Sequence, residues 1–290
     1  MKKLLLSAFV ICLAGTSIAQ ESPLWMRHCA LSPDGTTIAF TYKGDIYTVP
    51  STGGRATQIT TNPAFDTEPV WSPDSKQIAF ASDRMGSLDV FVVSSEGGAP
   101  QRLTTHSGSE KPVAYKDNKH ILFTANIAPS AEDAGFPSGQ FQQVYEVAVT
   151  GGRPAMFSSM PMECISINKE GVMLYQDKKG YEDYWRKHQV SPIARDIWTY
   201  TPGKKPVYQK QTTFGGEDRE PVWSPDGKSF YYLSEEKGSF NIFQRTPGTT
   251  TSQQITFHTK HPVRFLSIST TGTLLSLIHI SEPTRLRRIS

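Results

Sequence analysis

The sequence contains only three cysteines in 290 residues. Cys12 lies in an apolar N-terminal segment, which leaves Cys29 and Cys164 in the rest of the chain. An exported protein can form disulfides, but two cysteines in a large domain are more often separate buried residues. We therefore expect no disulfide framework, with Cys29 and Cys164 unpaired.

Long hydrophobic runs are also nearly absent. The one clear run extends from Leu4 to about Gly15, which is shorter than the ~20 residues of a membrane-spanning helix. Two lysines precede it and small residues follow it, which is the layout of a secretory signal. We expect residues 1–19 to be a signal peptide cleaved between Ala19 and Gln20, and the mature protein to be periplasmic or otherwise exported, without a membrane span.

The chain has little excess charge of either sign. The formal net charge is +3, from 30 basic and 27 acidic residues. Without the two lysines of residues 1–19 and the three arginines and one glutamate of residues 275–290, 25 basic residues face 26 acidic ones. The basic character is therefore terminal, and we expect no nucleic-acid partner.

Familiar catalytic motifs are missing. The sequence has no Gly-x-Ser-x-Gly nucleophile elbow, no His-Glu-x-x-His helix, no phosphate-binding glycine loop and no Cys-x-x-Cys pair. His258 and His261 have a spacing that a metal could use, but no third ligand accompanies them, which favours a solvated loop. We therefore expect this chain to contain no catalytic residue and to bind no metal ion or cofactor.

What the sequence does contain is a repeat. The heptapeptide EPVWSPD occurs unchanged at residues 68–74 and 220–226, and weaker copies recur between and around these two. Spacings of 40, 43, 53, 56 and 45 residues separate the equivalent positions Asp34, Asp74, Asp117, Glu170, Asp226 and Thr271. A drifting period of this size is typical of propeller blades with four strands each.

Each part of the repeat has a structural reason. Ser-Pro-Asp-Gly is turn chemistry, since proline presets φ, aspartate binds local backbone and glycine accepts positive φ. Short β-branched and aromatic runs follow it, as an inner strand requires. The predicted fold class is all-β: a β-propeller of four-stranded blades over residues 20–274, with about six blades of which the last stops after about one strand. This ring would be unclosed or poorly closed, and Trp71 and Trp223 would pack between blades.

The C-terminal segment abandons this pattern. LSLIHISEPTR, residues 275–285, resembles the translation of a transposon-end adapter used in preparing sequencing libraries. The alternative is a basic amphipathic tail that binds a membrane or nucleic acid. The resemblance implies that residues 275–290 are non-native and that the natural chain is interrupted near Leu274.

Two insertions interrupt the repeat, at residues 126–143 and 177–196. The second is dense in aromatic and basic residues, a composition typical of interaction surfaces, although an excursion that covers a blade edge would also explain it. The candidate interaction residues are Tyr181, Tyr184, Trp185, Arg186, His188 and Arg195.

With the repeats in place, the chain resembles the TolB-like and WD-like propellers of exported bacterial proteins through LSPDGTTIAF, VWSPDSKQIAF and VWSPDGKSFYY. The segment KGYEDYWRKHQVSPIARDIWTY, with the following FGGEDREPVWSPDGKSFYYLSEEKGSFNIF, resembles the start of tricorn-type serine proteases. The resemblance implies an N-terminal propeller that admits peptides or unfolded protein segments to downstream peptidase domains of the same chain. No position matches the catalytic residues of that family.

Two other functions stay open. The first is a non-enzymatic TolB-like propeller that binds partners in an envelope complex. The second is the propeller of a prolyl-oligopeptidase-like enzyme, whose continuation would contain a Gly-x-Ser-x-Gly elbow. The length and content of the natural reading frame beyond this sequence would separate the three.

Overall fold

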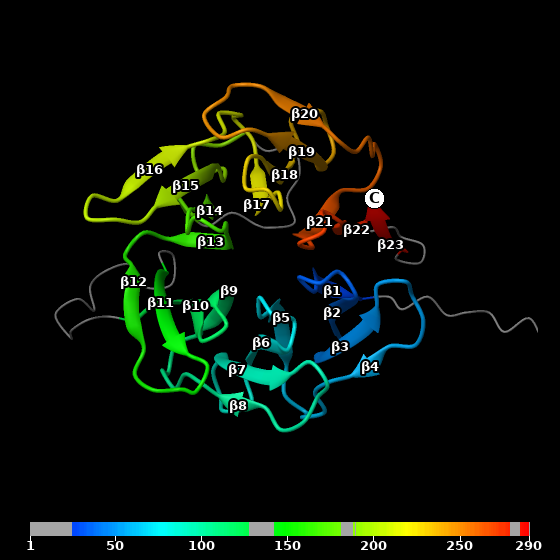
Figure 1. Cartoon of the computed structure of the whole chain (residues 1–290), viewed down its shortest axis with the longest axis vertical. Helices are drawn as coiled ribbons and strands as arrows, with labels where there is room; N and C mark the ends of the chain where they lie inside the picture. The colour runs from blue at the N-terminus through cyan, green and yellow to red at the C-terminus, as the bar shows by residue number, and fades with distance from the viewer. Residues whose placement is uncertain (1–24, 128–141, 181–187, 189, 279–284, 290) are drawn as a thin grey trace, which may run out of the picture.

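The computed structural model describes residues 25–127, 142–180, 188, 190–278 and 285–289. In these residues six antiparallel sheets follow one another around a ring, each with its first strand nearest the ring axis (Figure 1). Five of the sheets have four strands. The predicted all-β propeller of four-stranded blades is therefore confirmed.

The strands follow the chain in blade order. The first blade contains β1 (Arg27–Leu31), β2 (Thr37–Tyr42), β3 (Asp45–Pro50) and β4 (Thr57–Gln58), and the second β5 (Asp66–Trp71), β6 (Gln77–Ser82), β7 (Asp89–Ser94) and β8 (Gln101–Arg102). The third contains β9 (Lys111–Asp117), β10 (His120–Ala125), β11 (Gln143–Ala148) and β12 (Ala155–Ser158). The fourth contains β13 (Met162–Ile167), β14 (Met173–Asp177), β15 (Ile197–Thr201) and β16 (Val207–Lys210), and the fifth β17 (Asp218–Trp223), β18 (Phe230–Ser234), β19 (Asn241–Arg245) and β20 (Ser252–Gln254).

The expected number of about six blades is wrong, because the described residues form five four-stranded blades. The remaining C-terminal sheet has three strands, β21 (Val263–Ile268), β22 (Leu274–Ile278) and β23 (Arg285–Ile289), and no fourth, outer strand. It also does not stop after about one strand: β22 is buried, and β23 pairs with it from Leu274↔Ile289 to Ile278↔Arg285. The adapter origin of residues 275–290 stays a prediction.

The Ser-Pro-Asp turns close the first hairpin of the first, second and fifth blades in the same way. In the fifth blade the Ser224 hydroxyl donates to Asp226 Oδ1 at 2.6 Å, and the same oxygen accepts the Lys228 N–H at 3.0 Å. These two donors lower the pKa of Asp226. Gly227 follows with φ of +68°, a conformation that favours glycine. The repeated heptapeptide is thus a turn signal.

The two tryptophans of the repeat pack between blades, as expected. Trp71 and Trp223 are both buried, and each belongs to an apolar cluster shared with the preceding blade. The Trp71 indole N–H donates to the Ala30 carbonyl at 3.0 Å, and that of Trp223 donates to the Val172 carbonyl at 3.1 Å. Each indole therefore joins its own inner strand to the neighbouring blade.

We expect Trp223→Phe to lower the free energy of unfolding by about 1–3 kcal/mol, since it leaves the Val172 carbonyl without its donor and removes packed volume. Urea denaturation followed by circular dichroism measures the change. Tyr208→Phe on the exposed strand β16 is the matched control, expected to change the free energy of unfolding by less than about 0.5 kcal/mol. Equal effects of the two substitutions would contradict the assigned role.

Regular hydrogen bonds also join consecutive blades at one face of the ring. The carbonyl just before the third strand accepts the N–H of the residue that starts the next inner strand or immediately precedes it. The four pairs are Gly44 O with Asp66 N, Leu88 O with Glu110 N, Arg195 O with Asp218 N, and Phe240 O with Val263 N, at 2.7, 2.7, 3.0 and 3.0 Å. This face carries the loops between second and third strands and the links between blades, so the described ends of both insertions lie on it; we call it the insertion face.

The two ends of the ring meet through packing and isolated hydrogen bonds. The Leu31 N–H donates to Ser267 Oγ at 3.0 Å, and the Thr270 N–H donates to the Pro33 carbonyl at 2.7 Å. The His28 and Phe265 rings lie 4.9 Å apart between centroids. Among the described strands, no sheet combines strands from both ends of the chain.

Two further expectations can be compared with the structure. Cys29 and Cys164 are both free, as predicted. Within the described ranges, no helix has the length and apolar character needed to cross a membrane.

Candidate functional site

Of the six candidate interaction residues, Tyr181, Tyr184, Trp185 and Arg186 lie outside the described residues. His188 has an exposed side chain, and its backbone N–H donates to Glu235 Oε2 at 2.6 Å. Arg195 is only 6% exposed. The structure therefore places Arg195 inside the protein, at the base of the second insertion.

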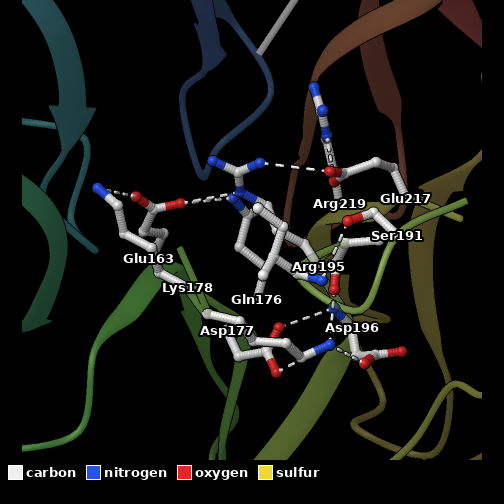
Figure 2. Close-up of polar contacts among 12 residues, drawn as sticks. Glu163, Gln176, Asp177, Lys178, Ser191, Arg195, Asp196, Glu217 and Arg219 are labelled. Carbon is white, nitrogen blue, oxygen red and sulfur yellow. Dashed lines mark hydrogen bonds and ion pairs between the residues drawn. The ribbon is translucent and has the colours of Figure 1, made fainter. Parts of the chain in front are cut away.

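Arg195 is the centre of a charged cluster between the fourth and fifth blades (Figure 2). Its Nε donates to Glu163 Oε2 at 3.2 Å, and its Nη1 lies 3.5 Å from Glu217 Oε1. Glu217 Oε2 in turn accepts the Nε–H of Arg219 at 2.8 Å. Lys178 Nζ lies 3.1 Å from Glu163 Oε1. These charges link β13 and β14 to the segment that begins β17.

The electrostatics of the cluster follow from burial and pairing. Desolvation by burial raises the pKa of Glu163, but Arg195 and Lys178 outweigh it, so the net pKa is below its ordinary value. Arg195 stays charged between Glu163 and Glu217, which raise its pKa despite burial. Glu163 and Arg195 therefore stabilise each other's charged form.

A second set of contacts closes the base of the second insertion. Lys179 Nζ forms an ion pair with Asp196 and donates to the Ala194 carbonyl at 2.6 Å. The Asp196 N–H donates to Asp177 Oδ1 at 2.8 Å (Figure 2). The Trp198 indole N–H donates to Asp177 Oδ2 at 2.9 Å. The two ends of the insertion are thus held together on the insertion face.

The inner strands bring further charged residues to the ring axis through a repeated bulge. The register breaks between Thr67 and Val70, Glu163 and Ser166, and Arg219 and Val222. Inside the breaks, Glu68, Cys164 and Glu220 have φ of 55°, 51° and 51°, in a region uncommon for residues other than glycine. Across two blades, Lys111 Nζ pairs with Glu68 Oε1 at 2.6 Å.

Cys164, inside one of these bulges, carries a side chain that could act as a nucleophile in its thiolate form. Burial raises the pKa of the Cys164 thiol well above its ordinary value, so the nucleophilic thiolate is disfavoured. Among the described residues, no group of three histidine, cysteine, aspartate or glutamate side chains could hold a metal ion.

Exposed apolar side chains gather on the same face. Nine large hydrophobic residues of the described chain are exposed, and six of them lie in loops and links of the insertion face. These six are Trp25, Phe65, Met85, Met160, Val190 and Phe257. The other three, Met156, Val207 and Tyr208, lie on the outer strands β12 and β16. The insertion face is therefore the candidate interaction surface among the described residues.

Sequence reasoning missed Glu163, Glu217 and Arg219. Glu217 and Arg219 lie directly before the second EPVWSPD. The charged run Glu217-Asp218-Arg219 there is typical of an exposed turn. They are buried where β17 packs against β13 and β14 of the preceding blade. The local sequence contains no signal for that burial.

The comparisons with known proteins agree with this architecture. The family model described as the tricorn protease N-terminal beta propeller domain matches residues 23–275. "Tricorn protease homolog 1" of Streptomyces coelicolor is 39% identical over 213 residues, which cover 73% of this chain and 19% of that protein. "Uncharacterized protein Atu1656" of Agrobacterium fabrum is 34% identical over 218 residues, 70% of this chain and 68% of that protein.

Solved structures show the same fold. The crystal structure of the tricorn protease superposes with a TM-score of 0.73 at 16% identity, covering 92% of this chain and 26% of that one. TolB from Acinetobacter baumannii gives 0.68 at 15% identity, covering 89% of this chain and 62% of that one. The chain thus spans about a fifth of the Streptomyces coelicolor relative and about a quarter of the tricorn structure.

Proposed function

The chain belongs to the family of tricorn protease N-terminal β-propeller domains, and we propose that it receives peptides or unfolded protein segments for an associated peptidase body. Unfolded polypeptide exposes apolar side chains that a folded protein buries. A propeller face that presents apolar residues from several blades can hold such a chain without reading one sequence. Hydrolysis itself is assigned to peptidase domains beyond this chain.

The observation that carries the proposal is the apolar composition of the insertion face. Val190 and Phe257 are 77% and 74% exposed although they lie beside well-buried blades. The base of the second insertion is held by Lys179, Asp177 and Asp196, so Val190 extends from a fixed support. A preorganised support reduces the entropy lost on binding. In this proposal Tyr181, Tyr184, Trp185, Arg186 and His188 add to the same surface, while buried Arg195 supports it.

The proposal also places the protein outside the cytoplasm. Its support is the signal-like layout of residues 1–19, which lie outside the described residues.

Binding of a permanently unfolded, fluorescently labelled polypeptide tests the role of the face. We expect the triple variant Phe65→Ser, Val190→Ser, Phe257→Ser to bind at least about tenfold more weakly in fluorescence anisotropy, because it removes three exposed apolar contacts. The matched control is Met156→Ser with Val207→Ser, which removes exposed apolar side chains from the outer strands. Equal losses in both variants, or none in the first, would overturn the proposal.

A further inference from the structure

The second and fifth blades are the two that share EPVWSPD, and their registers allow a residue-by-residue comparison. Asp66 pairs with Ser82 at the start of the second blade, and Asp218 pairs with Ser234 at the start of the fifth. The loops that follow also align without a gap, as SDRMGSLD (residues 82–89) and SEEKGSFN (residues 234–241). Asp66 therefore corresponds to Asp218, and Arg84 to Glu236.

In the second blade an arginine fills the space between these elements. Nη2 of Arg84 lies 3.0 and 2.9 Å from the two carboxylate oxygens of Asp66. Its guanidinium carbon lies 5.5 Å from the Phe80 ring centroid and 4.5 Å from that of Phe91. A buried carboxylate and two aromatic rings together hold this guanidinium.

The fifth blade keeps the buried aspartate and the two aromatic rings, but it has no arginine at the position of Arg84. Tyr232 and Phe243 replace Phe80 and Phe91, with ring centroids 5.9 Å apart against 5.8 Å in the second blade. Asp218 is buried like Asp66, but within the described ranges it has no ion-pair partner. The position of Arg84 is taken by Glu236, a second carboxylate.

The corresponding space is a cavity of about 430 Å³. Asp218, Tyr232, Phe243 and Glu236 line it, together with Phe214 and the segment around Ser252. Two cationic side chains also line it, and each has a partner other than Asp218. Lys237 Nζ lies 3.6 Å from Glu236 Oε1, and Arg245 Nε donates to the Thr249 carbonyl at 2.9 Å. The volume is within the range of small-molecule sites.

We propose that this cavity binds a guanidinium group, namely an arginine side chain of a bound polypeptide, in the place that Arg84 fills in the second blade. A planar guanidinium can stack on Tyr232 and Phe243 while donating to the Asp218 carboxylate, as Arg84 does. A metal ion is a poorer occupant, because the described part of the chain has no cluster of three ligands here. The choice of a polypeptide as the source of the arginine rests on the proposed function, whereas the preference of the cavity for a guanidinium does not depend on the insertion face.

Calorimetric titration of the whole chain with N-acetyl-arginine methylamide tests the inference, with the citrulline analogue as the uncharged isosteric control. We expect the arginine compound to bind at least about tenfold more tightly than the citrulline compound, and Asp218→Asn to remove that preference. Equal affinity for the two compounds, or an unchanged preference in Asp218→Asn, would overturn the proposal.

A variant that fills the cavity with an arginine of the chain itself distinguishes loss of the binding site from loss of the fold. Glu236→Arg recreates the arrangement of the second blade, so we expect it to abolish binding of the arginine compound while raising the thermal midpoint. Asp66→Asn, which alters only the second blade, should leave binding within about twofold of wild type. Retained binding in Glu236→Arg would contradict the assignment. The triple apolar variant of the insertion face should bind the arginine compound normally, so the two proposals can fail separately.

Discussion

Arg195→Ala is expected to lower the free energy of unfolding by about 1.5–3 kcal/mol, because it removes charge-assisted hydrogen bonds from two carboxylates at the blade junction. Arg195 lies between the carboxylates of Glu163 and Glu217, and it is itself buried. Its truncation removes one of the two cations that each carboxylate contacts, since Lys178 stays with Glu163 and Arg219 stays with Glu217. The backbone hydrogen bond from the Asp218 N–H to the Arg195 carbonyl is kept in this variant, so the measured loss reports on the side chain.

Urea denaturation monitored by tryptophan fluorescence measures this effect. The matched control is Lys116→Ala, which removes the exposed pair between Lys116 and Glu146 in the third blade. An exposed pair contributes about 0–1 kcal/mol, so the control should be nearly neutral. Arg195→Lys should give an intermediate loss, because an ammonium keeps the charge but not the two-sided geometry. A loss below about 1 kcal/mol in Arg195→Ala would show that the cluster does not hold the blades together.

Asp218 predicts a pH dependence of stability that Asp218→Asn removes. Burial raises the pKa of Asp218 from 3.8 to about 7, with Asp196 and Glu236 adding to the shift and the hydroxyls of Ser234 and Thr212 opposing it. The folded protein therefore binds this proton more tightly than the unfolded chain. Stability from this group is fully present below about pH 4 and is lost as the pH rises to about 7, by at most about 4 kcal/mol.

Thermal or urea unfolding of both proteins between pH 4 and 8 tests this sign. We expect the stability of Asp218→Asn relative to wild type to increase steadily up to about pH 7 and then level off. Asp66→Asn is the matched control with the opposite expectation at neutral pH, because Asp66 is paired with Arg84 and its removal leaves that guanidinium buried. Parallel pH profiles for wild type and Asp218→Asn would contradict the raised pKa.

The local chemistry of the repeat made much of the fold predictable. Ser-Pro-Asp turns, short aromatic runs and a spacing of 40–56 residues follow from interactions within one hairpin. For that reason the four-stranded blades and the interblade packing of Trp71 and Trp223 were predicted correctly. The number of blades was not, because among the described residues the last sheet has three strands and no fourth, outer strand.

The candidate site was only partly predictable. The composition of residues 177–196 indicated an interaction surface, yet it could not distinguish exposed His188 from buried Arg195. Burial of Arg195 arises where β17 packs on β14, and these strands are joined through long-range contacts.

The sequence by itself determined the turns, the strand alternation and the membership of a propeller family, since these depend on neighbours along the chain. The tertiary structure alone decided that the insertions share a face and that apolar side chains gather on it. It also decided whether the residue at the aligned positions Arg84 and Glu236 compensates the charge of the buried aspartate beside it. In the second blade a guanidinium compensates Asp66, whereas in the fifth blade Asp218 lines a cavity in which the guanidinium of Arg245 donates to the Thr249 carbonyl instead. Charge compensation in a buried site depends on the distance between side chains, and only the folded chain sets that distance.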